Sequence, residues 1–215
     1  MTSLTPTEAR AVYDRVGARQ DTQGWYEDPA TNLLLAHARL AEARAVFEMG
    51  CGTGRLAEAM LAAMPPDATY LGTDLSPVMV GLAEARLGAD PRATLQLVDG
   101  GPPARAPHSC DRFVSAYVFD LLSGEDARRS VASAHAMLRP GGLLCLAGLA
   151  PGHTALSRIV AAGWRSVWRL RPSLVGGCRP VPLAPLVSGT PWEIVAHERV
   201  APWGVPSEVL VARRT

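Results

Sequence analysis

The chain has 215 residues, 48% of them hydrophobic, so it is about the size of one large domain and can bury a sizeable core. Its 21 basic and 20 acidic residues leave a formal net charge of +1 at pH 7. That balance excludes the global field that concentrates nucleic acid, so we expect no nucleic-acid partner. All 21 basic residues are arginine, which excludes a Schiff-base lysine mechanism and indicates the codon bias of a GC-rich bacterial genome.

Cysteine usage and the apolar runs indicate the compartment. The four cysteines are far apart and show no paired Cys/His spacing, so neither a disulfide framework nor a metal site is implied. The polar segment from Met1 to Arg10 is unlike a signal peptide, and the longest apolar stretch, residues 141–150, is too short to span a bilayer. We therefore expect a cytoplasmic protein with no transmembrane segment, and its near-neutral net charge does not favour peripheral membrane contact.

Strand-like and helix-like segments alternate from about residue 45 onward, which predicts an α/β fold with a mainly parallel sheet. Strands are expected at residues 45–49, 69–73, 93–98, 112–118 and 143–149, and helices at 54–64, from Ser76 onward, at 124–138 and at 154–169. The last two apolar segments, 193–200 and 208–212, should pair as an antiparallel hairpin on the sheet edge.

Two helical stretches precede the first strand and belong to no βα unit. They are expected at residues 7–16 and 29–40, joined by an aromatic, polar loop at 17–28. Packing against the sheet edge would explain them, and so would a lid over a ligand.

The strongest signal is the glycine loop, Gly-Cys-Gly-Thr-Gly at residues 50–54, where a predicted strand ends and a helix begins. Alternate glycines let the backbone approach a ligand, and the helix N-terminus offers N–H donors to an anion. A dinucleotide fold would carry G-x-G-x-x-G, but the sixth position from Gly50 is Arg55. The spacing G-x-G-x-G, with Glu48 two residues earlier, resembles that of class I S-adenosylmethionine-dependent methyltransferases, of the small bacterial type that acts on small molecules.

Four further segments extend the resemblance over residues 45–150: Tyr70–Met79, Val98–Gly100, Ser115–Leu122 and Met137–Gly142. The resemblance implies a Rossmann-like, seven-stranded doubly wound sheet, with S-adenosylmethionine as cofactor and S-adenosylhomocysteine as product. It implies that Glu48, Gly50, Cys51, Gly52 and Gly54 hold the amino-acid end of the donor, that Asp74 and Leu75 meet its ribose and Asp99 and Gly100 its adenine, and that Tyr117 lines the site.

Each acidic residue also has a purely structural explanation. Glu48 could cap the next helix, Asp74 could form an Asx turn before Ser76, and Asp99 could be an ordinary loop carboxylate. Cys51 stands where a small residue is required and could serve packing alone.

The sequence carries fewer signals for the residues that would bind the methyl acceptor. Asp120, after the fourth strand, is our candidate for the catalytic base or orienting group, and His153, after the fifth, could overlook the acceptor; capping or surface roles are the alternatives for both. Tyr13, Trp25 and Tyr26 could wall the donor or the acceptor and attract the sulfonium through their ring faces, or simply pack.

The segment 127–192 holds eight arginines and no acidic residue. Within its predicted helix, one face holds the apolar residues Leu156, Ile159, Val160, Trp164 and Val167, and another holds the arginines Arg158, Arg165 and Arg169. This pattern fits a core helix with a solvated basic face, or one that meets an anionic acceptor or a membrane surface. Arg179, after a pair of glycines, is our first choice to bind an anionic group of the substrate, between the lid and residues 153–180.

We therefore predict one methyltransferase domain over residues 1–215, with a lid at 1–40, a donor-binding half at 41–150 and an acceptor-side half at 151–215. The expected reaction transfers a methyl group from S-adenosylmethionine to a small molecule. The alternatives are a nicotinamide-dependent oxidoreductase on a similar sheet and a protein that binds S-adenosylmethionine without transferring its methyl group.

Overall fold

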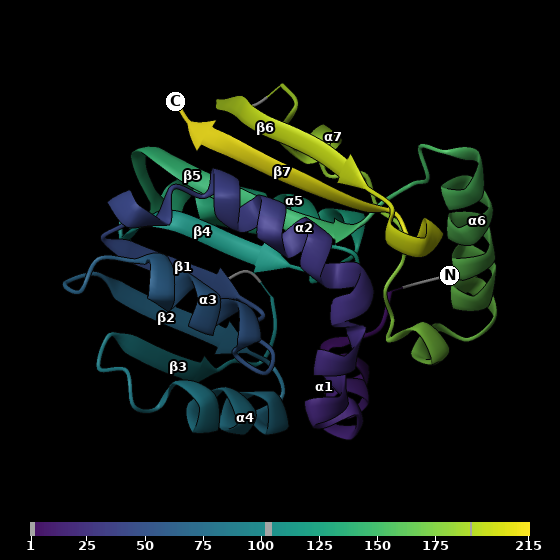
Figure 1. Cartoon of the computed structure of the whole chain (residues 1–215), viewed down its shortest axis with the longest axis horizontal. Helices are drawn as coiled ribbons and strands as arrows, with labels where there is room; N and C mark the ends of the chain where they lie inside the picture. The colour runs from purple at the N-terminus through teal and green to yellow at the C-terminus, as the bar shows by residue number, and fades with distance from the viewer. Residues whose placement is uncertain (1–2, 102–104, 190) are drawn as a thin grey trace.

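A seven-stranded sheet forms the centre of the molecule (Figure 1). The computed structural model describes residues 3–101, 105–189 and 191–215, so expectations for residues 1–2, 102–104 and 190 lie outside it. The strands are β1 Ala45–Met49, β2 Thr69–Asp74, β3 Ala93–Leu97, β4 Cys110–Ala116, β5 Leu138–Leu149, β6 Trp192–Val200 and β7 Ser207–Arg214. Their order in the sheet is β3-β2-β1-β4-β5-β7-β6.

Strands β1 to β5 run parallel, whereas β7 is antiparallel to both β5 and β6. This confirms the predicted Rossmann-like α/β fold with a terminal antiparallel hairpin. The order reverses between β1 and β4, and ligands bind at such a switch point in open α/β sheets.

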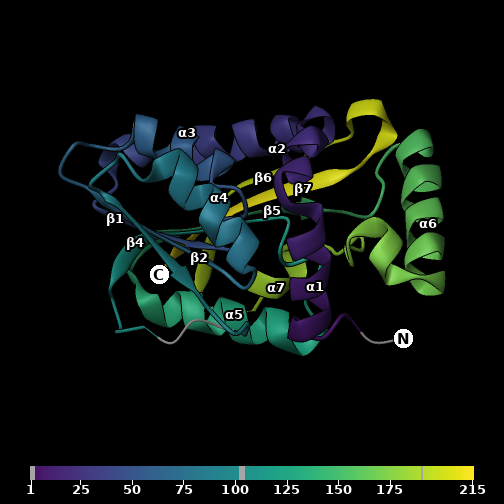
Figure 2. The same ribbon diagram turned by 90° about the horizontal axis from the view of Figure 1, so that it is seen from below.

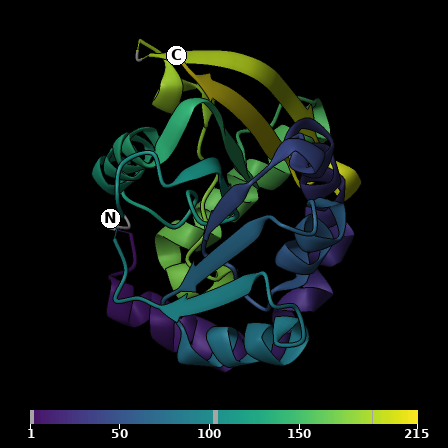
Figure 3. The ribbon, with the colours of Figure 1, turned by 90° about the vertical axis from the view of Figure 1, so that its left-hand side faces the viewer.

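Helices cover both faces of the sheet (Figures 2 and 3). The α-helices are α1 Pro6–Val16, α2 Gly24–His37, α3 Arg55–Ala63, α4 Pro77–Leu87, α5 Gly124–Met137, α6 Ala155–Leu170 and α7 Ala184–Val187. Short 3₁₀ turns are η1 Gly17–Gln23, η2 Leu40–Glu42, η3 Pro172–Val175 and η4 Pro202–Gly204. In the described part of the chain, no helix is both long and apolar enough to cross a bilayer.

The core has two layers because alternate residues of each strand point to opposite faces. In β1, Val46 belongs to the cluster beneath α2 and α3, whereas its neighbour Phe47 packs in the other cluster, beneath α5. The central strands are thus buried on both faces, as expected of a parallel sheet.

The predicted loop at residues 17–28 was wrong. Residues 17–23 form η1, and α2 begins at Gly24, so Pro29 lies inside the helix rather than at its start. Tyr26, Ala30 and Leu34 are buried on one side of α2. That packing outweighs the backbone hydrogen bond lost at the proline, which local sequence signals do not reveal.

The end of β4 also differs from the prediction. The strand ends at Ala116, two residues early, because Tyr117 adopts a positive φ of 56° that an extended strand cannot continue. This turn brings Tyr117 and Val118 to the site described next.

Candidate functional site

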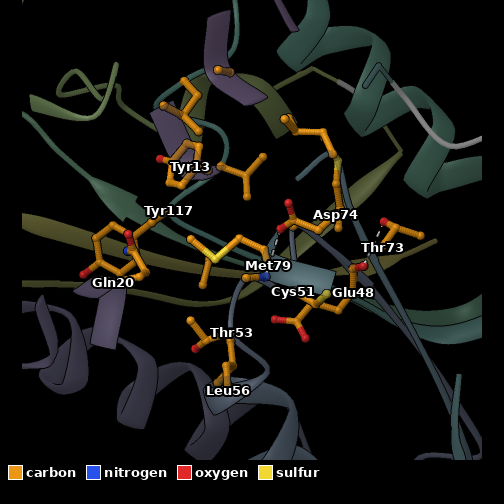
Figure 4. Close-up of a pocket in the computed structure, with 18 of the residues that line it drawn as sticks. Tyr13, Gln20, Glu48, Cys51, Thr53, Leu56, Thr73, Asp74, Met79 and Tyr117 are labelled. Atoms are coloured by element: carbon orange, nitrogen blue, oxygen red, sulfur yellow. Dashed lines mark hydrogen bonds between the residues drawn. The ribbon is translucent and has the colours of Figure 1, made fainter. Parts of the chain in front are cut away.

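A cavity of about 600 Å³ lies at the carboxyl ends of β1, β2 and β4. It is bounded by the glycine loop, by residues just after β2, β3 and β4, and by the N-terminal elements α1, η1 and α2. Figure 4 shows Tyr13, Gln20 and Tyr117 at one side and Glu48 and Asp74 at the other. The cavity therefore spans the switch point and has two chemically different ends.

The glycine loop needs its glycines for two separate reasons. Gly50, Gly52 and Gly54 all have positive φ, a region that other residues rarely adopt. A Cβ on Gly50 would lie 2.3 Å from Cγ2 of Val118, and one on Gly54 would lie 3.1 Å from Cα of Ala83 in α4. At Gly52 nothing lies within 4 Å of the same position, so there the backbone is open to a ligand.

Asp74 links the loop to the next helix. One carboxylate oxygen accepts a hydrogen bond from the Gly52 N–H at 2.9 Å, and the other accepts from the Ser76 N–H at 2.9 Å. Ser76 in turn caps α4 by accepting from the Met79 N–H. Burial raises the pKa of Asp74 although these backbone donors oppose the shift. The Asx turn that we considered is therefore present, and the same carboxylate also lines the cavity.

Glu48 lies on the cavity wall with 1% of its surface exposed. Its carboxylate accepts a hydrogen bond from the Tyr70 hydroxyl. Burial raises its pKa to about 8, while the bond from Tyr70 acts against the rise. Cys51 is also buried and lines the cavity.

The adenine end differs from the expectation. Val98 and Gly100 line the cavity, but Asp99 is exposed and pairs with Arg10 at 3.2 Å. The structure therefore does not bring the Asp99 carboxylate into the cavity. Its side chain lies in solvent beside Arg10 of α1.

Side chains of α1 hold the elements that follow β2 and β3. Arg10 donates to the carbonyl of Leu75 at 2.8 Å, and the Ser76 hydroxyl donates to Asp14 at 2.6 Å. Leu75 lines the cavity at this point.

The segment after α1 is tied to the glycine loop in the same way. Asp21 accepts from the Thr53 hydroxyl and from Arg86, both at 2.6 Å. Asp28 forms an ion pair with Arg55 at 2.6 Å. The N-terminal segment is thus joined to each donor-side motif, which mere packing against a sheet edge would not require.

The opposite end of the cavity carries polar side chains. Tyr13 and Tyr117 line it, and the Gln20 amide donates to Glu27 at 3.2 Å. Glu27 is buried, and this burial raises its pKa to about 7 although Arg55 opposes the shift. Glu27 was not among the predicted site residues, because residues 17–28 read as a loop. Glu27 lies one helical turn before Thr31 on the cavity face of α2, so a helix predicted from residue 24 would have revealed its position.

Asp120, our candidate base, lies outside the cavity lining. It is 1% exposed and accepts a hydrogen bond from the Leu149 N–H at 3.2 Å. Its other carboxylate oxygen, Oδ1, has no hydrogen-bond partner among the described residues. Burial raises the pKa of Asp120 to about 7. The structure thus places one oxygen of this carboxylate against the backbone of β5.

Asp120→Asn is expected to stabilise the protein increasingly as the pH rises. A carboxyl whose folded pKa lies above its unfolded value destabilises the fold as the pH rises through that interval, and asparagine does not ionise. Between pH 5 and pH 8 the variant should gain about 2–3 kcal/mol of unfolding free energy relative to wild type. Urea denaturation at both pH values measures this difference. A pH-independent difference would show that Asp120 ionises normally.

The remaining candidates on the acceptor side also lie away from the cavity. His153 is exposed, and Trp25 packs edge to face on Tyr26 but is half exposed. Tyr26 is buried, and its hydroxyl donates to Gln23.

Arg179 has protein partners. Its guanidinium donates to the carbonyl of Leu122, and its carbon lies 5.5 Å from the ring centre of Trp168. Main-chain carbonyls and an aromatic face thus partner the guanidinium in this structure, and binding of a substrate anion there stays a prediction. In the described part of the chain, the cavity lining ends at Asp126, so residues 153–180 do not wall it as expected.

Comparison with known proteins agrees with the geometry of the donor end. A family model described as a methyltransferase domain matches residues 46–142. That range contains the glycine loop, Asp74 and the turn after β4. Residues 46–142 thus resemble a methyltransferase domain of the class I, S-adenosylmethionine-dependent kind.

Curated relatives of this methyltransferase domain match over part of their length. A carboxy-S-adenosyl-L-methionine synthase of Chromohalobacter salexigens is 33% identical over 115 residues, which are 53% of this chain and 43% of the relative. A trans-aconitate 2-methyltransferase of Methylobacterium radiotolerans is 35% identical over 136 residues, 60% of this chain and 49% of the relative. The chain thus spans about half the length of these two relatives.

Solved structures share the fold of the methyltransferase domain. The [4+2]-cyclase SpnF superposes with a TM-score of 0.74 at 16% identity, covering 100% of this chain and 98% of the other. A geranyl diphosphate methyltransferase in complex with S-adenosylmethionine gives a TM-score of 0.65 at 13% identity, covering 88% and 86%.

S-adenosylmethionine is the cofactor of this family, and the cavity fits it. Gly52 leaves the backbone open, and Asp74 presents a carboxylate beside it. The volume of about 600 Å³ accommodates a ligand of this size. When bound, the cofactor supplies an activated methyl group.

Proposed function

We propose that this chain transfers a methyl group from S-adenosylmethionine to a small-molecule acceptor in the cytoplasm. The observation that carries the proposal is the continuity of the cavity, which runs from the glycine loop and Asp74 to the polar group of Tyr13, Gln20 and Glu27. Donor and acceptor would meet in one space, which is the main requirement of a transfer that depends on positioning. The family match supports the donor half of this proposal.

At the donor end, we assign the amino-acid part to Glu48 and the glycine loop and the ribose to Asp74. The main chain at Val98 and Gly100 would border the adenine, in place of the Asp99 carboxylate. A carboxylate with two oxygens suits the two ribose hydroxyls.

At the acceptor end, Glu27 replaces Asp120 and His153 in our assignment. It is a cavity-lining carboxylate that could accept a proton from a hydroxyl or amine, and the Gln20 amide fixes its orientation. The acceptor wall would thus come from residues 1–40, with the donor-binding half at 41–150 and a supporting half at 151–215.

A binding role without methyl transfer is the second candidate. The likeness to the [4+2]-cyclase SpnF extends over the whole chain, although at 16% identity it concerns the fold. Incubation with methyl-labelled S-adenosylmethionine and a pool of small bacterial metabolites separates the two candidates. Label in a product supports transfer, whereas altered metabolites without label would favour the second role.

S-adenosylhomocysteine is expected to raise the melting temperature, whereas NADH is not. At a ligand concentration 100 times Kd, binding to the folded state alone adds about 2.7 kcal/mol. For a chain of this size that is a shift of roughly 5–10 °C. Differential scanning fluorimetry measures it. Stabilisation by NADH alone would instead support the oxidoreductase alternative.

A further inference from the structure

Helix α6 stands at one end of the molecule, beyond the ends of the strands, in two perpendicular views (Figures 1 and 2). Its inner face is anchored by two tryptophans. The indole N–H of Trp164 donates to the carbonyl of Cys178, and that of Trp168 donates to the carbonyl of Gly177, both at 2.9 Å. These bonds and the buried Ala161 fix which face of the helix points outward.

The outward face is apolar. Ile159 is 70% exposed and Leu170 is 85% exposed, and Leu156 also faces solvent. Of the alternatives that the sequence left open for this helix, packing of Leu156 and Ile159 in the core does not occur, because the tryptophans take the inward positions. Leu156 and Ile159 are three residues apart, and Leu170 follows Ile159 by eleven residues, which is about three helical turns, so the three side chains lie along one apolar stripe.

The stripe continues beyond both ends of α6. At its start lies Trp203 of η4, 82% exposed, whose neighbour Gly204 is packed against Leu156. At its end lies Leu174 of η3, also exposed. Six of the eleven large exposed hydrophobic residues in the described chain belong to α6, η3 or η4. The stripe is thus a local concentration rather than the scatter expected on any protein surface.

A row of arginines flanks the stripe. Arg158, Arg165 and Arg169 are exposed, and none forms a salt bridge with a described residue. The sequence carries no acidic residue between positions 127 and 192 that could neutralise them. The near-neutral net charge of the chain therefore conceals a strongly basic region.

We propose that α6, with η3 and η4, docks on an anionic lipid surface, its apolar stripe entering the headgroup boundary and its arginines meeting lipid phosphates. The arrangement is that of an interfacial helix, with a basic row beside an apolar stripe and an exposed tryptophan at one end. Arginine stems can lie along the apolar boundary while their charged ends reach the headgroups. A protruding helix suits a broad flat surface better than the groove that a peptide would need. This replaces our expectation against peripheral membrane contact.

Vesicle sedimentation of the full chain tests the proposal. Vesicles of phosphatidylcholine and phosphatidylglycerol at about 7:3 should bind the protein at least about tenfold more tightly than pure phosphatidylcholine vesicles do. Ile159→Glu and Leu170→Glu should each lower this binding about tenfold or more, because each places a charge in the stripe. Replacing the three arginines together with glutamine should remove the preference for anionic vesicles.

Ile194→Glu is the matched control, because Ile194 is an exposed aliphatic residue on β6, 45% exposed and outside the stripe. It should bind vesicles like the wild type. Far-UV circular dichroism establishes that every variant is folded. The proposal is overturned if the wild type binds neither vesicle, or if Ile194→Glu loses as much binding as Leu170→Glu. It is also overturned if ultracentrifugation shows a dimer that Leu170→Glu dissociates while vesicles are not bound, since a second copy would then cover the stripe.

Discussion

Asp74→Ala is expected to weaken the binding of S-adenosylhomocysteine about 100-fold, or by ~2.7 kcal/mol. The change removes the proposed partner of the ribose hydroxyls. It also removes the acceptor that holds the Gly52 N–H and the Ser76 N–H, so the glycine loop and the start of α4 lose their shared anchor. Isothermal titration calorimetry gives the affinity directly.

Two further variants test whether the loss of affinity comes from the Asp74 carboxylate itself. Asp74→Asn keeps one acceptor oxygen in place and should lose less affinity than the alanine variant. Asp99→Ala removes an exposed carboxylate of the same loop region, paired with Arg10, and should bind nearly as the wild type. If Asp74→Ala retains full affinity, another residue holds the ribose and the proposed donor assignment fails at this position.

Gly50→Ala is expected to lower the free energy of unfolding by about 2–4 kcal/mol and to abolish measurable binding of S-adenosylhomocysteine. The substitution combines an unfavourable φ of 78° with a contact of 2.3 Å to Val118, so the loop or Val118 must move. Chemical denaturation and calorimetry on the same protein measure both effects.

Gly52→Ala serves as the control, because Gly52 shares the positive φ but has nothing within 4 Å of the position that a Cβ would take. Gly52→Ala should lower the free energy of unfolding by only about 1–2 kcal/mol, which is the cost of the positive φ for a residue other than glycine. If both variants are equally destabilised, the close contact between residue 50 and Val118 does not contribute to the loss of stability.

The grouping of the glycine loop and Asp74 at one end of the cavity could be predicted because its signals are local. A glycine loop between a strand and a helix, and an acid at the end of the next strand, require contacts only across neighbouring parallel strands. Gly50, for example, donates to the carbonyl of Thr73 at 2.8 Å in the adjacent strand. The α/β alternation fixes that adjacency, so the short motifs are enough to bring these residues together.

The acceptor half could not be predicted, because long-range packing decides it. Pro29 and the polar run before it read as a loop, yet burial of Tyr26 extends α2 through them and turns Glu27 toward the cavity. Conversely, Asp120 follows β4 at a position where a catalytic base would be expected. Its carboxylate instead accepts a hydrogen bond from the Leu149 N–H and lies against β5. Sequence spacing does not tell which side of a turn a carboxylate takes.

The position of β7 between β5 and β6 bears on how the chain folds. Strand β6 precedes β7 in the sequence but reaches the sheet only by pairing with it. During synthesis, residues 192–200 would therefore emerge with no strand to join until residues 207–214 follow. The five parallel strands that carry the donor end need none of this hairpin for their own pairing. The edge of β5 would meanwhile expose unpaired N–H and C=O groups, so the growing chain would be open to aggregation during this interval.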